Sequence, residues 1–158
     1  MVKTQEQFTK EVLTENFIMK SLIAAIEGSD DRIEVHEDGQ NKPDDLVFVV
    51  PEHSKVILTF KFVVKNKPIK KLTYYQAIKK AGIPLKTRNE NIAEYLEPNT
   101  PENPVYTHTF SPEDVPGGFF ARGTHPASSH FYEDGKEFLV IHWHIDINKK
   151  GTKPHLKH

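Results

Sequence analysis

The most regular alternation of apolar and polar residues lies in residues 139–147, near the C-terminal end of the chain. One parity of this stretch is entirely apolar: Leu139, Ile141, Trp143, Ile145 and Ile147. The opposite parity is mostly polar: Val140, His142, His144 and Asp146. Because successive side chains of a strand point to opposite faces, the pattern predicts a strand with one face in a core and one in water. The single tryptophan then points inward.

A second apolar stripe lies in Lys55–Val64, where it follows the even positions. Its members are Val56, Leu58, Phe60, Phe62 and Val64. We expect this face to meet the apolar face of residues 139–147. The space between the two faces is the expected place of a functional site.

Short runs of β-branched and aromatic residues, separated by turn residues, predict the remaining strands. They cover residues 16–26, 32–36, 46–50, 72–78, 105–110 and 119–124. Two alternatives stay open. Residues 16–26 are apolar on both parities and would also suit a helix, although Gly28 directly after them favours a strand. Residues 76–82 would also suit a helical turn.

Polar and proline-rich segments predict the connections between these strands. Residues 65–68 and 132–137 indicate turns, and residues 111–118 a loop. Residues 88–104 are expected to be the longest irregular segment, since proline disrupts regular hydrogen bonding. The prolines in question are Pro98, Pro101 and Pro104.

The two ends of the chain differ in character. Residues 4–15 predict one short amphipathic helix with Phe8, Val12 and Leu13 near one another. A helix of this length needs a partner surface to be ordered. Residues 149–158 predict a frayed polar tail.

Seven to nine short strands with turn signals between them are typical of an antiparallel β-sandwich. We therefore predict an all-β, immunoglobulin-like antiparallel β-sandwich with a short N-terminal helical arm. The expected division is an arm at residues 1–15, the sandwich at residues 16–150 and a polar tail at residues 151–158.

Composition narrows the function classes. The chain has 158 residues, 37% of them hydrophobic and 27% charged, which suits one soluble domain. A net charge of -1 argues against bulk nucleic-acid binding. Without cysteine there is no disulfide, zinc-thiolate site or cysteine nucleophile. Because neither a signal peptide nor a membrane-spanning run is evident, we expect a cytoplasmic protein.

Candidate chemistry is sparse. His142 and His144 share one face of a strand, a spacing that some metal sites use, but a solvent-facing position is favoured because no third ligand completes a shell. Ser128, Ser129 and His130 are neighbours whose side chains point apart, and no G-x-S-x-G motif supports a nucleophile. We therefore expect no enzyme, no cofactor and no metal.

Large rings are numerous for a small sandwich. Most of them are expected simply to fill the core. Two sheets held apart by bulky rings can also leave an internal slot, and composition leaves both possibilities open. The rings are Phe60, Phe62, Tyr74, Phe110, Phe119, Phe120, Phe131, Phe138 and Trp143.

One stretch resembles a known family. Residues 115–120 read V-P-G-G-F-F and residues 121–124 read A-R-G-T. This order is similar to a motif of the Rho GDP-dissociation inhibitors, in which a proline, a glycine and two apolar residues precede Ala-Arg-Gly. The resemblance extends upstream over residues 60–76, with Tyr74 and Gln76, and downstream through Phe131, Glu133, Asp134, Trp143 and the I-N-K-K of residues 147–150.

The resemblance implies a sandwich whose sheets part to take up the geranylgeranyl tail of a prenylated Rho/Rac-type GTPase. The inhibitor extracts the GTPase from membranes, without stable insertion of its own, and keeps it GDP-bound. By motif position, Phe62, Phe120 and Trp143 are expected to line the prenyl slot. Acidic pairs are expected to face the basic segment before the prenylated cysteine: Glu113 and Asp114, and Glu133 and Asp134.

Three departures from the family pattern modify this expectation. Ile141 stands where family members carry a second tryptophan, and Ala127 where they have a larger apolar residue, which predicts a wider or reshaped slot. The loop of residues 88–104 is longer. The N-terminal arm is short, so that Phe8, Val12 and Leu13 are the candidates for contacting the GTPase switch regions.

Two rival functions follow from other readings of the same residues. A general prenyl- or acyl-protein carrier would solubilise lipidated cargo without controlling nucleotide exchange. A metal-dependent β-sandwich enzyme would use His142 and His144.

Overall fold

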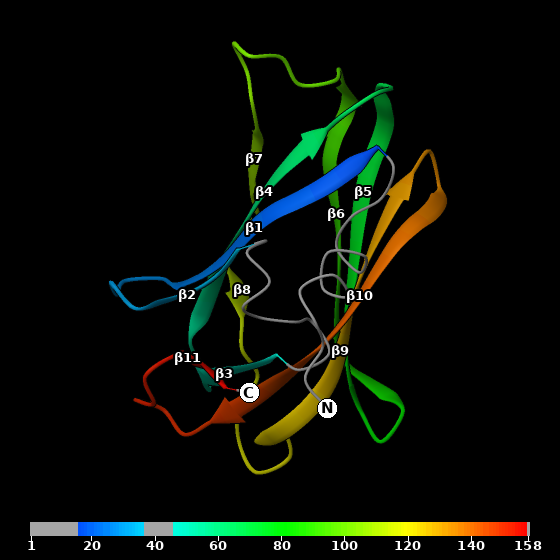
Figure 1. Ribbon diagram of the computed structural model, residues 1–158. Helices are drawn as coiled ribbons and strands as arrows, with labels where there is room; N and C mark the ends of the chain where they lie inside the picture. The colour runs from blue at the N-terminus through cyan, green and yellow to red at the C-terminus, as the bar shows by residue number, and fades with distance from the viewer. Residues whose placement is uncertain (1–15, 37–45, 158) are drawn as a thin grey trace.

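The computed structural model describes residues 16–36 and 46–157 as eleven strands in two sheets. The strands are β1 Phe17–Ile26, β2 Arg32–His36, β3 Val47–Pro51, β4 Lys55–Val64, β5 Ile69–Lys80, β6 Ile83–Leu96, β7 Tyr106–Thr109, β8 Glu113–Asp114, β9 Gly123–Glu133, β10 Lys136–Asn148 and β11 His155–Lys157. Figure 1 shows the two sheets facing one another. The all-β sandwich predicted from the sequence is confirmed.

One sheet has the order β2-β1-β4-β7, with β8 also pairing with β4. The other has the order β11-β3-β10-β9-β5-β6. Neighbouring strands are antiparallel except β3 and β10, which run parallel. Two tight hairpins, at Ala81–Gly82 and Asp134–Gly135, have positive φ at both turn residues, as two-residue type I′ connections require.

The two stripes predicted from alternation meet as expected. In β10, Leu139, Ile145 and Ile147 are buried, and Ile141 and Trp143 are half-buried against the core. In β4, Phe60 and Phe62 are buried while the lysine between them, Lys61, is exposed. The alternation therefore correctly predicts which face of each strand is buried.

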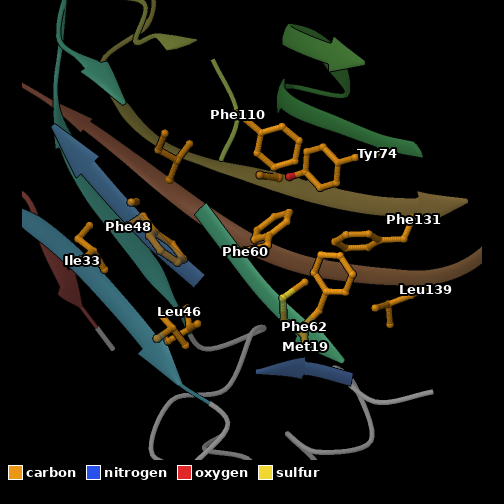
Figure 2. Close-up of a cluster of buried hydrophobic side chains, with 14 of the residues drawn as sticks. Met19, Ile33, Leu46, Phe48, Phe60, Phe62, Tyr74, Phe110, Phe131 and Leu139 are labelled. Carbon is orange, nitrogen blue, oxygen red and sulfur yellow. The ribbon is translucent and has the colours of Figure 1, made fainter. Parts of the chain in front are cut away.

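Aromatic rings fill one half of the space between the sheets. The Phe60 ring centroid lies 5.3 Å from that of Tyr74, 5.2 Å from Phe110 and 5.6 Å from Phe131. These separations are typical of tilted and edge-to-face ring pairs. In Figure 2 these rings crowd together, whereas Phe48 and the aliphatic residues near it form a second group. The expectation that most rings fill the core holds for these residues.

Three predictions, about an irregular segment, a strand and the C-terminal tail, are wrong. Residues 88–96 belong to β6, which pairs with β5 along its length, because the three prolines all follow Leu96 and end the strand instead of preventing it. Residues 119–122 are not a strand: the backbone N–H groups of Ala121 and Arg122 donate to Gly118 O at 3.1 and 3.0 Å, and β9 begins only at Gly123.

The third error concerns the C-terminal tail. Residues 155–157 are not frayed but form β11, which pairs antiparallel with β3. Strand β3 is short and offers a free edge, and Leu156 packs against the hydrophobic core. An apolar residue facing the core therefore outweighs the polar composition of the segment. The predicted helix of residues 4–15 lies outside the described residues.

Candidate functional site

An apolar cavity of about 130 Å³ lies between the two sheets. This is roughly ten times the ~10–15 Å³ that a single water requires. Strands β1, β2 and β4 of one sheet supply Met19, Leu22, Ala24, Val35, Val56, Leu58 and Phe60. Strands β3, β5, β9 and β10 of the other supply Phe48, Val50, Tyr74, Ile78, Phe131, Ile141, Trp143 and Ile145. A lining of aliphatic and aromatic carbon suits an apolar ligand.

Trp143 is held in the wall of this cavity by a chain of hydrogen bonds. Its indole Nε1–H donates to Ser129 Oγ at 3.0 Å, and Ser129 Oγ lies 2.8 Å from Tyr74 OH. Tyr74 OH donates to Gln76 Oε1 at 2.7 Å. Burial raises the pKa of Tyr74 well above its ordinary value, so the phenol keeps its proton and remains a donor. Among residues 16–36 and 46–157, no buried side-chain nitrogen or oxygen lacks a hydrogen-bond partner. The hydrogen bonds from Trp143 to Gln76 therefore hold the indole in one orientation.

Replacing Ser129 with alanine is expected to destabilise the fold by about 1–3 kcal/mol, because the Trp143 N–H and the Tyr74 oxygen lose a buried partner. Urea denaturation measures this change. Ser128→Ala is the matched control, since Ser128 contacts His130 on the opposite face of β9, and about 0.5 kcal/mol or less is expected there. Equal losses of unfolding free energy in the two variants would contradict the hydrogen bonds assigned to Ser129.

Charged residues surround one side of the cavity where the two sheets approach. Arg88 Nη2 on β6 donates to Glu90 Oε1 at 2.7 Å and to Ser111 O at 2.8 Å. Arg88 Nε lies 3.5 Å and Lys86 Nζ 3.8 Å from carboxylate oxygens of Glu113 on β8. These contacts tie β6 of one sheet to β8 of the other. We call Lys86, Arg88, Glu113 and Asp114, all of which line the cavity, the charged rim.

The residues expected to bind a prenyl group occupy different environments. Ile141 and Trp143 line the cavity. Ala127 is buried and pairs with Trp143 across β9 and β10. Phe62 is buried outside the lining, with its ring centroid 5.1 Å from that of Phe17. Phe120 lies outside the cavity and is largely exposed.

The two acidic pairs are not brought together. Glu113 and Asp114 belong to the charged rim, and Asp114 Oδ1 lies 3.9 Å from Lys55 Nζ. Glu133 and Asp134 lie at the β9–β10 turn, which Figure 1 shows at the other end of the sandwich from β8. Of the remaining predicted contacts, Phe8, Val12 and Leu13 fall outside the described residues.

The histidines offer little support for a metal centre. His142 is exposed on β10 and His144 is partly exposed on the same face. Among residues 16–36 and 46–157, no three or more His, Asp or Glu side chains gather closely enough to hold a metal ion.

An ion pair between the buried side chain of Glu52 and the exposed side chain of Arg122 anchors the loop before β9. Glu52, with a side chain only 7% exposed, accepts from Arg122 Nε at 2.5 Å and from Nη2 at 2.9 Å, and from Gly118 N at 3.3 Å. The hydrogen bonds and charge of Arg122 hold the pKa of Glu52 at about 2, below its ordinary value of 4.5. Sequence reasoning missed Glu52, because it sits in a turn whose partner is 70 residues away.

This pair predicts a pH dependence of stability. Because the folded-state pKa of Glu52 lies below that of the unfolded chain, its stabilisation is complete above pH 4.5 and is lost as pH falls toward about 2. Glu52→Gln is expected to flatten this part of the profile, measured by thermal unfolding across that range. Glu102→Gln, on the exposed 97–105 loop, is the control. Profiles of identical shape in all three proteins would contradict the assignment.

The site is an apolar cavity between the two sheets of a β-sandwich, with charged residues at its rim. The sequence model of the RHO protein GDP dissociation inhibitor family matches residues 2–150, and the chain belongs to this family. This confirms the family suggested by the motif at residues 115–124. The family consists of non-enzymatic regulators.

Two curated proteins are similar to this chain. The Rho GDP-dissociation inhibitor of Saccharomyces cerevisiae is 36% identical over 104 residues, which cover 65% of this chain and 51% of that protein. Rho GDP-dissociation inhibitor 1 of Arabidopsis thaliana is 31% identical over 109 residues, covering 68% and 44%. The chain thus spans about half the length of these relatives. Within residues 16–36 and 46–157, no helix has the length and apolar character needed to cross a membrane.

Proposed function

We propose that this protein is a Rho GDP-dissociation inhibitor that binds a prenylated Rho/Rac-type GTPase. It takes the geranylgeranyl group into the cavity between the sheets, extracts the GTPase from membranes and holds it GDP-bound in the cytosol. The observation that carries the proposal is the apolar cavity walled by Trp143 and Ile141. Membership of the inhibitor family supports it independently.

The energetics of a lipid anchor explain why a cavity is needed. A prenyl chain gains about 0.8 kcal/mol for each buried methylene, and a membrane offers the same gain. A carrier must therefore bury nearly the whole chain and add protein contacts of its own. Phe62 and Ala127, both buried, would pack beside the lining. The assignment of Phe120 rests on the resemblance alone, because its ring lies outside the cavity and is exposed.

The charged rim is suited to a basic segment next to the prenylated cysteine. Glu113 and Asp114 are already engaged by lysines and Arg88 across the rim. A basic segment would compete for these carboxylates and loosen the link between β6 and β8, which joins the sheets at the cavity. Such ion pairs at a partly exposed rim are weakened by salt, so cargo binding should be salt-sensitive. Glu133 and Asp134, at the β9–β10 turn, would contact basic residues of the GTPase at the end of the sandwich opposite the charged rim.

Control of nucleotide release requires contacts beyond the cavity. The helical arm predicted at residues 1–15, with Phe8, Val12 and Leu13, would supply them by contacting the switch regions. The immunoglobulin-like arrangement of the sandwich would then present the arm and cavity to a single GTPase. The division into arm, sandwich and tail remains a prediction.

The alternative is a general prenyl- or acyl-protein carrier without control of nucleotide exchange, which the cavity supports equally. Capture of prenylated and unprenylated Rho-type GTPase, together with the rate of GDP release, separates the two. We expect the prenylated GTPase to be retained and its GDP release to slow. Retention with unchanged release would favour the carrier, and equal retention of the unprenylated GTPase would overturn both.

A further inference from the structure

Large apolar side chains are exposed together at one end of the sandwich. Within the described residues, four such side chains are at least half exposed: Ile83 at 69%, Tyr95 at 50%, Phe119 at 96% and Phe120 at 66%. Three of them lie in two adjoining segments, the β5–β6 hairpin and the loop before β9. Lys80 connects these segments, since it pairs with Ile83 across the hairpin and its Nζ lies 3.9 Å from the Phe120 ring centroid. Isolated exposed apolar residues are ordinary, but a cluster indicates an interaction surface.

The loop before β9, which carries Phe119 and Phe120, is anchored by contacts with Glu52, His53 and Lys80. Arg122 is bound by the nearly buried carboxylate of Glu52, and Gly118 N donates to the same carboxylate. Gly117 passes so close to the His53 ring that an added Cβ would overlap it. Lys80 Nζ also donates to Phe120 O. The loop is therefore held in place while Phe119 points into solvent.

Positive charge gathers at the same end. The exposed Lys149 and Lys150 directly follow β10, whose Ile147 pairs with Gly123 at the start of β9. Figure 1 shows the β5–β6 hairpin, the loop before β9 and the end of β10 at the same end of the molecule. Two acidic groups nearby are paired with cations: Glu52 with Arg122, and Asp114 with Lys55 at 3.9 Å. The lysines in this group are Lys79, Lys80, Lys149 and Lys150.

We propose that this end of the sandwich is a docking surface for an anionic membrane. Exposed aromatic side chains surrounded by lysines are the combination that lies at a bilayer interface, with rings at headgroup depth and lysines against acidic headgroups. The surface carries a local positive charge on a chain whose net charge is -1. It therefore complements an anionic bilayer although the whole chain does not.

The position of this surface relates it to the cavity. Val115 and Pro116, which line the cavity, lead directly into the loop that carries Phe119. Docking would bring the charged rim close to the bilayer surface, where the prenyl group of a membrane-bound GTPase leaves the membrane. The docking itself needs no cargo and does not depend on the proposed function.

Vesicle flotation of the purified chain, without a GTPase, tests the proposal. The vesicles are phosphatidylcholine alone, or phosphatidylcholine with about one-third phosphatidylserine. We expect binding to the anionic vesicles that weakens with salt and is much lower on neutral ones. Phe119→Ser combined with Ile83→Ser is expected to lower partitioning about ten-fold or more, and Lys149→Gln with Lys150→Gln to reduce it on anionic vesicles. Tyr95→Ser, at the exposed large side chain that lies outside this cluster, is the matched control and should bind as the parent does.

Several results would overturn the docking surface. One is a parent chain that does not float with anionic vesicles, and another is a Phe119→Ser/Ile83→Ser variant that floats as well as the parent. Loss of affinity for a geranylgeranylated peptide in that variant, with vesicle binding unchanged, would assign the surface to cargo. Self-association that the variant abolishes, without vesicle binding, would assign it to a second copy. Trp143→Ala should keep vesicle binding, so failure of the cargo proposal is distinguishable from failure of this one.

Discussion

Replacing Trp143 with alanine is expected to lower affinity for a geranylgeranylated Rho-type peptide roughly ten- to hundred-fold. The indole lines the cavity, and burying a side chain of this kind against an apolar ligand contributes about 1.5–3 kcal/mol. Because the ring is half-buried and faces the cavity, we expect the loss of stability to fall below the ~3–5 kcal/mol of a fully packed tryptophan. Isothermal titration and urea denaturation measure the two quantities.

Trp143→Phe is the matched control for this experiment. It keeps an apolar ring beside Phe48, whose ring centroid lies 5.4 Å from that of the indole, but loses the donor to Ser129. We expect it to retain most of the affinity that alanine loses. If the alanine variant folds and binds cargo as the parent does, Trp143 is not part of the lipid site.

The second large effect concerns the filled half of the core. Phe17→Ala is expected to destabilise the chain by about 3–5 kcal/mol, since Phe17 is 1% exposed and would leave a cavity among packed rings. Its ring centroid lies 5.1 Å from that of Phe62, 5.5 Å from Phe131 and 5.4 Å from Phe138. Urea denaturation measures the change.

Phe17→Leu provides the comparison, because it keeps most of the apolar volume and should cost about 1.5 kcal/mol or less. A loss below about 1 kcal/mol in the alanine variant would show that this end of the sandwich is loosely packed. The expected difference in stability loss between Phe17→Ala and Trp143→Ala would then disappear.

The strands and register of the sandwich could be predicted where alternation is strict. In β4 and β10 the apolar parity alone specifies which face is buried, because a shift of one residue would expose every member. Trp143 and Ile141 were placed toward the space between the sheets on the same ground. The local pattern sufficed because each side chain's direction depends only on its own strand.

Features that depend on distant partners could not be predicted. Strand β6 is a sheet edge whose central residues 86–91 are all polar or charged, and its identity depends on pairing with β5. The loop at residues 118–122 is fixed by Glu52, and β11 by the free edge of β3. From the sequence alone, Ser129 beside His130 suggests a nucleophile. Its parity with Ala127 and Phe131 was the signal that it points inward to the indole.

Emission from Trp143 offers the most direct test of the central claim, because it is the single tryptophan of the chain and stands in the cavity wall. A geranylgeranylated peptide with a basic segment is titrated into the protein, and the same peptide without the lipid serves as control. The cavity account predicts a saturable change in indole emission that is complete at one equivalent of the lipidated peptide, with none for the control. Unchanged emission at saturating lipidated peptide, or equal changes with both peptides, would contradict it.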